Sequence, residues 1–444
     1  MVVNNLKNNY VYPIYTSDTD DISLNNINKI HVKNIDKRPI SIKAQEENEV
    51  NLDKFDHRIL GKNMNLFSFC SISGVVSWHK NGFFLLEQLK NYIRTFWKMN
   101  NYNEVVTPII YNCDLWKKSG HWDVFADNMI KVNVGNEECA LKPMNCPGHG
   151  LLFNLGNKSY RDLPYKMSEF GCCHRNEPSG ALQGLLRTRS FTQDDSHVFC
   201  TLDQIEGVVT NFCNMLLKIY KHLRFDEVKI YLSTRPDRFI GSESDWVCAE
   251  HVLHKIAQKE TRFNYEIAPG EGAFYGPKLE FHIKDRNGRF WQCGTVQIDF
   301  SLCKRLDVRY TDKDGERKHP IVIHHAVLGS LERFVAILLE DRKGVLENWL
   351  APINAVIIQM TNNDKISRYV QDVLKQLDDY RVIIDNNDDT LSSKVKRWIE
   401  ERVPIQIVIG EKESNKQELS VRILGENLQV INFSQIRTFM EKNI

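Results

Sequence analysis

EFHIKDRNGRFWQCGTVQIDF (residues 280–300) decides the fold class of this chain. It contains two runs in which apolar and polar side chains alternate, separated by an Asn-Gly pair. Alternation of this kind is typical of strands, and Asn-Gly favours a tight turn between antiparallel strands. LDVRYTDKDGERKHPIVIHH (residues 306–325) repeats the pattern about an Asp-Gly pair. The two adjacent hairpins predict an antiparallel sheet.

The pattern changes beyond Pro352, where short apolar runs alternate with amphipathic ones. Strands are predicted over 353–360, 380–385 and 404–410, and helices over 363–379 and 390–402. We therefore expect an α+β body over residues 56–348, followed by a separate α/β domain over residues 349–444.

The N-terminal residues 1–55 are rich in Asn, Asp, Lys and Ile and have no sustained helical or alternating period. They predict a weakly ordered extension, in which residues 29–35 could add a short strand. The charged run over 46–67 predicts a helix that leads into the body.

Composition excludes several classes of protein. The 444 residues carry 58 basic and 57 acidic side chains, and 42% are hydrophobic, which indicates a globular chain of two or three domains. No stretch approaches the ~20 apolar residues of a membrane helix, so no membrane association is expected. The eleven cysteines, without a CxxC pair and with no secretory or transit signal before them, predict reduced thiols and a cytoplasmic location.

The strongest local signal for a functional site is RTRSFTQDDSHVFC, residues 187–200. In a strand, alternate side chains share one face, so Gln193, Asp195 and His197 project together. An amide, a carboxylate and an imidazole side by side suit a polar pocket wall. An exposed polar strand face is the alternative, and this segment alone leaves both open.

Two other segments offer metal ligands. Cys146 lies in a turn rich in Pro and Gly, and His324 ends an apolar strand before a helix. With His197 they would leave the fourth position of a tetrahedral zinc open, as in catalytic or substrate-binding sites. Ligands this far apart have no diagnostic spacing, and a lone cysteine is more often a buried apolar residue, so the residues alone leave the metal open.

A competing set is Cys248, His251 and His254, spaced at i, i+3 and i+6 on a probable helix. Its outer members lie about 120° apart around the helix axis, so one helix cannot bring all three to one metal. We interpret them as surface residues.

Arginines cluster in two places. Arg175 is predicted on a strand, Arg187 and Arg189 on the returning strand after a loop, and Arg333 in the first turn of a helix. The planar guanidinium suits phosphate oxygens, although salt-bridged surface arginine is the commoner fate of any one of them. Neither GxxxxGK[ST] nor GxGxxG occurs, which excludes P-loop and Rossmann nucleotide sites.

Three segments resemble the signature motifs of class II aminoacyl-tRNA synthetases. They are 101–112 with Pro108 (motif 1), 169–177 with Arg175 and Glu177 (motif 2), and 329–334 with Arg333 (motif 3). From about Asp56 to the C-terminus the chain is similar to threonyl-tRNA synthetases in particular. The segments that carry this likeness are KPMNCPGH, FTQDDSHVFC, STRPDRFIGS, GEGAFYGPKLEF, WQCGTVQIDF and IHHAVLGSLERF.

The resemblance implies a catalytic domain built on an antiparallel sheet flanked by helices, an anticodon-binding α/β domain, and a homodimer with motif 1 at its interface. The implied reaction activates L-threonine with ATP to threonyl-adenylate and transfers it to the 3′ end of tRNA(Thr). Mg²⁺ accompanies ATP.

By the same resemblance, one Zn²⁺ per subunit is held by Cys146, His197 and His324. Zinc that takes the amino and hydroxyl groups of threonine rejects valine, which an apolar pocket would separate poorly. The resemblance places Asp195 at the threonine hydroxyl, with Gln193 and Tyr275 lining the pocket.

The resemblance also assigns the nucleotide and RNA contacts. Arg175 meets the α-phosphate and Arg333 the γ-phosphate, with Glu177, Arg187 and Gln292 as further ATP contacts. Glu413 and Arg422 occupy the expected anticodon-reading positions.

The chain departs from the family in four places. His325 follows the third zinc ligand where Arg is usual, so an altered contact near the active site is expected. Asp388 stands where Asn is usual, which places an acid near tRNA, and residues 68–83 lack the usual Pro-Gly. None of the 14 histidines forms the HxxxH of the family's N-terminal editing domain. A truncated form that misactivates serine and cannot clear Ser-tRNA(Thr) is therefore expected.

A second hypothesis remains open. The chain could be a synthetase paralogue with a tRNA-binding, regulatory or resistance role and no aminoacylation. His325 and residues 386–393 support it, and the retained Arg175 and Arg333 speak against it.

Overall fold

The computed structural model describes residues 53–259, 264–285 and 287–443, and its largest element is an eight-stranded sheet of order β10-β9-β11-β12-β15-β8-β7-β3. Neighbouring strands run antiparallel except at the two edges, where β10 with β9 and β3 with β7 are parallel. The strands are β3 (Asn103–Glu104), β7 (Tyr165–His174), β8 (Ser190–Cys200), β9 (Val228–Ser233), β10 (Tyr265–Ala268), β11 (Lys278–Lys284), β12 (Phe290–Asp299) and β15 (Ile321–Ser330).

The hairpin predicted over 280–300 is confirmed as β11 and β12, with Leu279 opposite Val296. The second hairpin is only partly as expected. Strands β13 (Tyr310–Thr311) and β14 (Arg317–Lys318) form a two-stranded ribbon, whereas β15 pairs with β12 and β8. The apolar run that begins at Ile321 is long enough to cross the main sheet.

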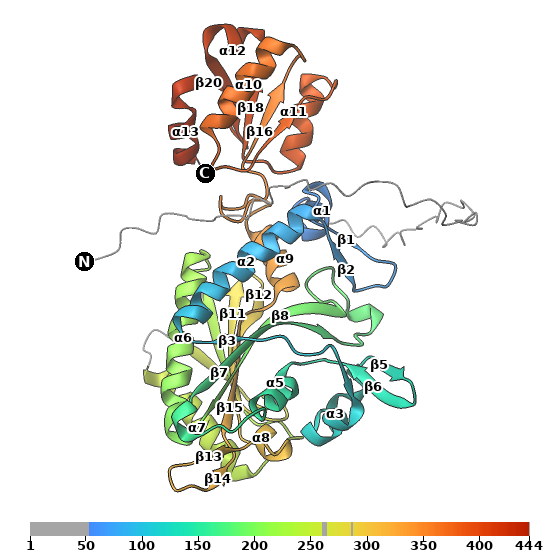
Figure 1. Ribbon diagram of the computed structural model, residues 1–444, viewed down its shortest axis with the longest axis vertical. Coiled ribbons are helices and arrows are strands. Elements are labelled where there is room, and N and C mark those ends of the chain that lie inside the picture. Colours follow the sequence, from blue (N-terminus) through green and yellow to red (C-terminus); the bar gives the residue numbers. More distant parts are fainter. Residues whose placement is uncertain (1–52, 260–263, 286, 444) are drawn as a thin grey trace, which may run out of the picture. The chain divides into compact units, whose positions relative to one another are not determined.

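Two groups of helices cover the two faces of this sheet (Figure 1). Helices α2 (Lys80–Met99), α6 (Ile205–His222), α7 (Glu243–Lys259) and α9 (Leu331–Asp341) share the main core with Val198 and Ile323. Helices α5 (Cys146–Phe153) and α8 (Leu302–Arg305) pack with Phe199 and Val322. Because side chains alternate along a strand, neighbouring residues of β8 and β15 belong to different cores.

The charged run over 46–67 does not form one helix within the part of the chain that the structure describes. Helix α1 covers only His57–Asn63, and Asp56 caps its N-terminus. Asn65 adopts a left-handed φ of 52°, which ends the helix before β1 (Phe67–Phe69) pairs with β2 (Val76–Trp78). The strand expected at 29–35, and all of the predicted extension except 53–55, lie outside the described residues.

The chain between α2 and β7 also forms a smaller three-stranded sheet of order β4-β6-β5. Its strands are β4 (Ile110–Asn112), β5 (Lys131–Val134) and β6 (Glu137–Leu141). Helices α3 (Cys113–Ser119) and α4 (His121–Phe125) follow β4. None of the described helices has the length and apolar character needed to cross a bilayer.

The C-terminal part is α/β, as predicted. Its sheet has the order β17-β16-β18-β19-β20, with β16 parallel to both β17 and β18. Its elements are β16 (Ala355–Gln359), α10 (Asp364–Gln376), β17 (Val382–Asp385), α11 (Leu391–Glu400), β18 (Ile405–Ile409), α12 (Glu411–Lys416), β19 (Glu418–Ile423), β20 (Gln429–Asn432) and α13 (Ile436–Asn443). The chain therefore combines an α+β body with an α/β region.

Candidate active site

Three side chains that are far apart in the sequence converge on one face of the large sheet. One ligand atom from each of Cys146, His197 and His324 lies within 4.8 Å of the other two. His197 of β8 is directly opposite His324 of β15 in the antiparallel register. Cys146 opens helix α5 and is not in a turn, and His324 lies in mid-strand and not at a strand end, because β15 continues to Ser330.

The two histidines face each other through defined nitrogens. His197 Nε2 lies 2.9 Å from His324 Nδ1. Their other nitrogens have their own partners. His324 Nε2–H donates to Asp299 Oδ2 at 3.2 Å, and His197 Nδ1 lies 2.7 Å from His149 Nδ1.

A buried acid fixes the ring of His149. Glu169 Oε2 accepts from His149 Nε2–H at 3.1 Å, and Oε1 accepts from Lys142 Nζ at 2.8 Å. Thr107 of motif 1 donates its backbone N–H to Glu169 Oε1 at 3.0 Å and its hydroxyl to Glu169 Oε2 at 2.8 Å. Although burial alone would raise it, the hydrogen bonds from His149 and Lys142 hold the pKa of Glu169 at about 2.

This network assigns the hydrogens on the rings. The carboxylates of Glu169 and Asp299 accept only, so His149 Nδ1 is left as the acceptor for His197 Nδ1–H. His197 Nε2 and His324 Nδ1 then both carry lone pairs. Sequence reasoning missed His149, Glu169 and Asp299, because their spacing carries no signal before the fold brings them together.

Burial dominates the protonation of the cluster. It raises the pKa of the Cys146 thiol well above its usual value and lowers that of His197 well below. His121 was also missed: its Nε2 lies 3.7 Å from Cys146 Sγ, and burial lowers its pKa to about 4. Burial therefore favours the uncharged forms of Cys146, His197 and His121.

Asp195 lies two residues before His197 on the same strand face, as the alternation predicts. Asn145 Nδ2 donates to Asp195 Oδ2 at 2.9 Å, and burial raises the pKa of Asp195. The ring of Tyr275 lies 5.1 Å from that of His324, which places it beside the donor cluster. Gln193 is opposite Ser330 in the register, beyond a β-bulge in β15.

The arginines of motifs 2 and 3 meet beside the sheet. Arg333 donates to the carbonyl oxygens of Leu186 and Gln292 at 2.9 and 3.3 Å. Burial, with the nearby charges of Arg175 and Arg187, lowers the pKa of Arg333. Arg175 stacks on Phe191, with 5.0 Å between the guanidinium carbon and the ring centre. No carboxylate partner is found for Arg175 or Arg333 among the described residues.

The other predicted nucleotide contacts lie near this group. Arg187 forms an ion pair with Glu177 at 2.9 Å, and Gln292 donates to Glu280 and Thr295. Arg187 and Arg189 are not on the returning strand, which begins only at Ser190. Arg189 donates its backbone N–H to the carbonyl oxygen of Gly74, and its own carbonyl oxygen accepts from Arg175 N–H.

His325 lies on the opposite face of the sheet from His324. Its ring stacks on Phe212 of α6 at 4.2 Å, and Tyr102 lies 2.9 Å from its Nε2. Burial lowers its pKa to about 3. The expectation of an altered contact near the active site was therefore wrong, since strand alternation turns His325 toward the helices.

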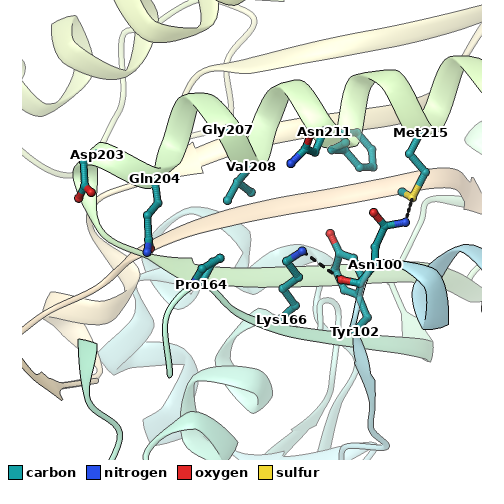
Figure 2. A pocket seen from close by; sticks show the side chains of 11 residues that line it. Asn100, Tyr102, Pro164, Lys166, Asp203, Gln204, Gly207, Val208, Asn211 and Met215 are labelled. Carbon is teal, nitrogen blue, oxygen red and sulfur yellow. Dashed lines mark hydrogen bonds between the residues drawn. The ribbon is translucent and has the colours of Figure 1, made fainter. Parts of the chain in front are cut away.

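A cavity of about 270 Å³ lies beside Tyr102, between α6 and the β7 edge (Figure 2). Figure 2 shows Lys166 of β7 pointing into it, with its ammonium donating to the Asn100 carbonyl oxygen at 3.0 Å. None of the predicted site residues lines this cavity. It is therefore separate from the donor cluster.

The remaining predicted residues lie in other parts of the chain. Glu413 accepts from Gly410 N–H at 3.0 Å and from the Ser420 hydroxyl at 2.9 Å. Arg422 of β19 has a buried Nε without a hydrogen-bond partner among the described residues. On α7, His254 contacts Gln258 and Tyr265, and its neighbours there do not join it in a metal-binding group of the described chain.

Two family models match the chain. The tRNA synthetase class II core domain (G, H, P, S and T) matches residues 130–342, and an anticodon binding domain matches residues 354–443. A threonine–tRNA ligase of Prochlorococcus marinus (strain MIT 9215) is 44% identical over 393 residues, and that of Rickettsia canadensis is 44% identical over 394. Each alignment covers 88% of this chain but only 61% and 62% of the relative's length.

Solved structures agree with these matches. The RNA binding domain of threonyl-tRNA synthetase from Cryptosporidium parvum Iowa II is 37% identical, with a TM-score of 0.79 over 87% of this chain and 98% of that one. A threonyl-tRNA synthetase described as putative, ThrRS-1 from Aeropyrum pernix, is 29% identical, with a TM-score of 0.73 over 87% and 96%. The fold, the two matched domains and this likeness together show that the chain belongs to the threonyl-tRNA synthetase family of class II aminoacyl-tRNA synthetases.

Proposed function

We propose that this chain is a threonine–tRNA ligase, which activates L-threonine with ATP to threonyl-adenylate and transfers it to the 3′ end of tRNA(Thr). The observation that carries the proposal is the convergence of Cys146, His197 and His324 within 4.8 Å. Asp195 lies on the same strand face, so the donors and a hydrogen-bond acceptor line one pocket. Two matched domains, one for catalysis and one for the anticodon, support the full reaction.

The donor cluster fits one Zn²⁺ per subunit. Two lone pairs held 2.9 Å apart repel each other unless a cation or a proton lies between them. Sulfur and two imidazoles suit zinc and leave one or more positions for substrate. Bound there by Cys146, His197 and His324, zinc would accept the amino and hydroxyl groups of threonine.

The residues around the cluster then select the substrate. Asp195 accepts a hydrogen bond from the threonine hydroxyl, and Asn145 holds the carboxylate in place. Valine offers no hydroxyl, so its binding would leave Asp195 buried without this partner, which disfavours it more than a lost apolar contact could. Tyr275 and Gln193 complete the pocket wall.

ATP is bound by the arginines. Arg175 contacts the α-phosphate, where charge develops during attack, and Arg333 contacts the γ-phosphate. Both act by positioning and charge, with Mg²⁺ sharing the phosphate charge. Their lack of carboxylate partners among the described residues supports this role, because a guanidinium already paired with an acid would bind phosphate less strongly. Glu177, Arg187 and Gln292 are further contacts with the nucleotide.

The anticodon is recognised by residues 349–444, with the catalytic domain over 56–348. Arg422 is half-buried on β19, and its guanidinium suits a phosphate or a base edge of RNA. Both carboxylate oxygens of Glu413 accept protein hydrogen bonds, so Glu413 shapes the anticodon site by holding Gly410 and Ser420 in place. The acid at Asp388 weakens nearby phosphate contacts.

The ligase is a cytoplasmic homodimer. Motif 1 exposes apolar side chains, with 88% of Val106, 47% of Ile109 and 45% of Ile110 accessible. A row of exposed apolar residues of this kind suits a partner subunit. All eleven cysteines are free thiols, which agrees with a reducing compartment.

Serine carries the same hydroxyl, so this site does not exclude it. None of the 14 histidines forms HxxxH, and we propose that these 444 residues misactivate serine and do not hydrolyse Ser-tRNA(Thr). Ser-tRNA(Thr) should persist when it is incubated with the purified chain. Rapid deacylation would overturn this part of the proposal.

The whole proposal is tested by two assays on the purified chain. Threonine-dependent exchange between pyrophosphate and ATP measures activation, and charging of tRNA(Thr) isoacceptors measures transfer. Both should occur with threonine and fail with valine. tRNA binding without either activity would instead favour the non-catalytic paralogue.

A further inference from the structure

The motif 2 loop is held from two sides by buried groups. Its segment Gly184–Leu186 is packed into the main core, where Leu185 is 0% and Leu186 3% exposed. The backbone N–H of Leu185 donates to His57 Nε2 at 3.0 Å. The carbonyl oxygen of Leu186 accepts from Arg333 Nε at 2.9 Å. Two consecutive loop residues are thus bound by α1 and by α9.

His57 also contacts the far end of α9. Because Nε2 accepts from Leu185, the ring hydrogen is on Nδ1, which donates to Glu340 Oε1 at 2.7 Å. Arg289 donates to the other carboxylate oxygen of Glu340 at 2.7 Å. His57, α9, Arg333 and the loop segment therefore form a closed ring of contacts, in which His57, Glu340, Leu185 and Leu186 are buried and Arg333 is half-buried.

The arrangement is not a second metal site, although Asp56, His57 and Glu340 offer ligand atoms within 4.8 Å of one another. Asp56 is paired with Arg58 at 2.9 Å, and Glu340 with Arg289. Both nitrogens of His57 are already engaged with protein groups. A cation would have to displace two ion pairs and a backbone hydrogen bond.

The loop approaches the ring so closely that it requires glycine. A Cβ atom at Gly184 would lie 2.2 Å from His57 Nε2, and the φ of Gly184 is 53°. Leu185 follows Gly184 directly, and Arg187 is three residues after Gly184. The position of His57 therefore determines where the loop turns back toward the Arg187–Glu177 ion pair. We propose that His57 is a positioning residue for ATP, which fixes the motif 2 loop against the helix that carries Arg333.

This inference rests on the proposed ATP site. His57→Leu removes both hydrogen bonds and leaves the buried Leu185 N–H without a partner, a loss that corresponds to roughly a tenfold change in a binding constant. In ATP–pyrophosphate exchange we expect KM for ATP to rise about tenfold, with KM for threonine and zinc content unchanged. His57→Gln, whose amide can both accept and donate, should recover most of the affinity.

The outcomes are distinguishable. Absence of exchange by the wild-type chain would defeat the proposed function itself. Wild-type exchange with an unchanged KM for ATP in His57→Leu, or equal losses in Leu and Gln variants, would overturn the positioning role. Gly184→Ala offers a second test from the loop side: it should raise KM for ATP, and less so when combined with His57→Ala, which removes the clash. Additive effects of the two changes would contradict direct contact.

Discussion

His197 Nε2 and His324 Nδ1 lie 2.9 Å apart on adjacent antiparallel strands, with Cys146 Sγ completing the group. The acids Glu169 and Asp299 accept hydrogen bonds from the outer nitrogens of His149 and His324. The strand register therefore brings His197 Nε2 and His324 Nδ1 to one point, where a single cation or proton lies between them.

Loss of the sulfur donor should remove the metal. We expect Cys146→Ser to lower bound zinc from about one per chain to well below it and to abolish threonine activation. Zinc content by elemental analysis and exchange activity measure the two effects. His251→Ala, on the exposed face of α7, is the matched control and should keep both. Full activity of Cys146→Ser in a zinc-free preparation would refute the ligand assignment.

The ring of His149 should tune zinc affinity without touching zinc. His149→Leu leaves His197 Nδ1–H without its acceptor, and outer-shell losses of this kind cost about 10–100-fold in metal affinity. His149→Gln can accept from His197 and donate to Glu169, so it should retain most of the affinity. Competition with a chelator measures both variants. Equal zinc affinity in the Leu variant and the wild type would show that the network is only structural.

The two motif arginines should act at different stages of ATP use. Arg175→Ala should lower kcat for exchange by about 10²-fold or more, because it removes charge at the reacting phosphate. Arg333→Ala should act mainly on KM for ATP. Steady-state exchange kinetics separate the effects. Arg317→Ala, an exposed arginine of β14, should change neither. Wild-type kinetics in both Arg175→Ala and Arg333→Ala would show that ATP does not bind at these arginines.

The exposed apolar row of motif 1 should carry the dimer. Val106→Asp places a charge at a side chain that is 88% exposed in the single chain, so it should not unfold the subunit but should convert the dimer to a monomer. Analytical ultracentrifugation gives the mass. Val247→Asp, at a 63% exposed position of α7, is the control and should stay dimeric. An unchanged mass for Val106→Asp would exclude this surface.

Glu332 should make stability depend on pH. Burial raises the pKa of its carboxyl from 4.5 to about 7, so the folded chain binds this proton more tightly than the unfolded chain. Its contribution to stability is complete below pH 4.5 and is lost as the pH rises through 7. Glu332→Gln has no carboxyl to titrate. From pH 5 to pH 8 its free energy of unfolding should therefore rise by about 2 kcal/mol relative to that of the wild type. Urea unfolding at the two pH values measures it, and a constant difference would contradict the shift.

Much of the fold follows from periodicity. The alternation in 280–300 and the mixed pattern beyond residue 350 correspond to β11–β12 and to the C-terminal α/β sheet. The same alternation put Asp195 and His197 on one face of β8. These predictions succeed because side-chain direction along a strand is a local property.

The rest depends on tertiary contacts. The positions of His324 and Cys146 within their elements were wrong, since apolar runs and Pro-Gly pairs do not define where a strand or helix ends in the packed sheet. His149, Glu169 and His57 gave no signal because each acts through a partner 20 or more residues away. Such contacts exist only once the sheet has been assembled.

Asp194 limits which insertions and deletions the pairing of β8 with β15 can accept. Between Ala326 and Ser330 the strand β15 carries more residues than β8 opposite it, and Asp194 accepts the displaced backbone N–H groups of Val327, Leu328 and Gly329. One side chain on the face away from the pocket thus sets the register at which motif 3 begins. An insertion or deletion in this bulge would change where helix α9 begins relative to His197 and His324, and so would move Arg333 away from the Cys146–His197–His324 group.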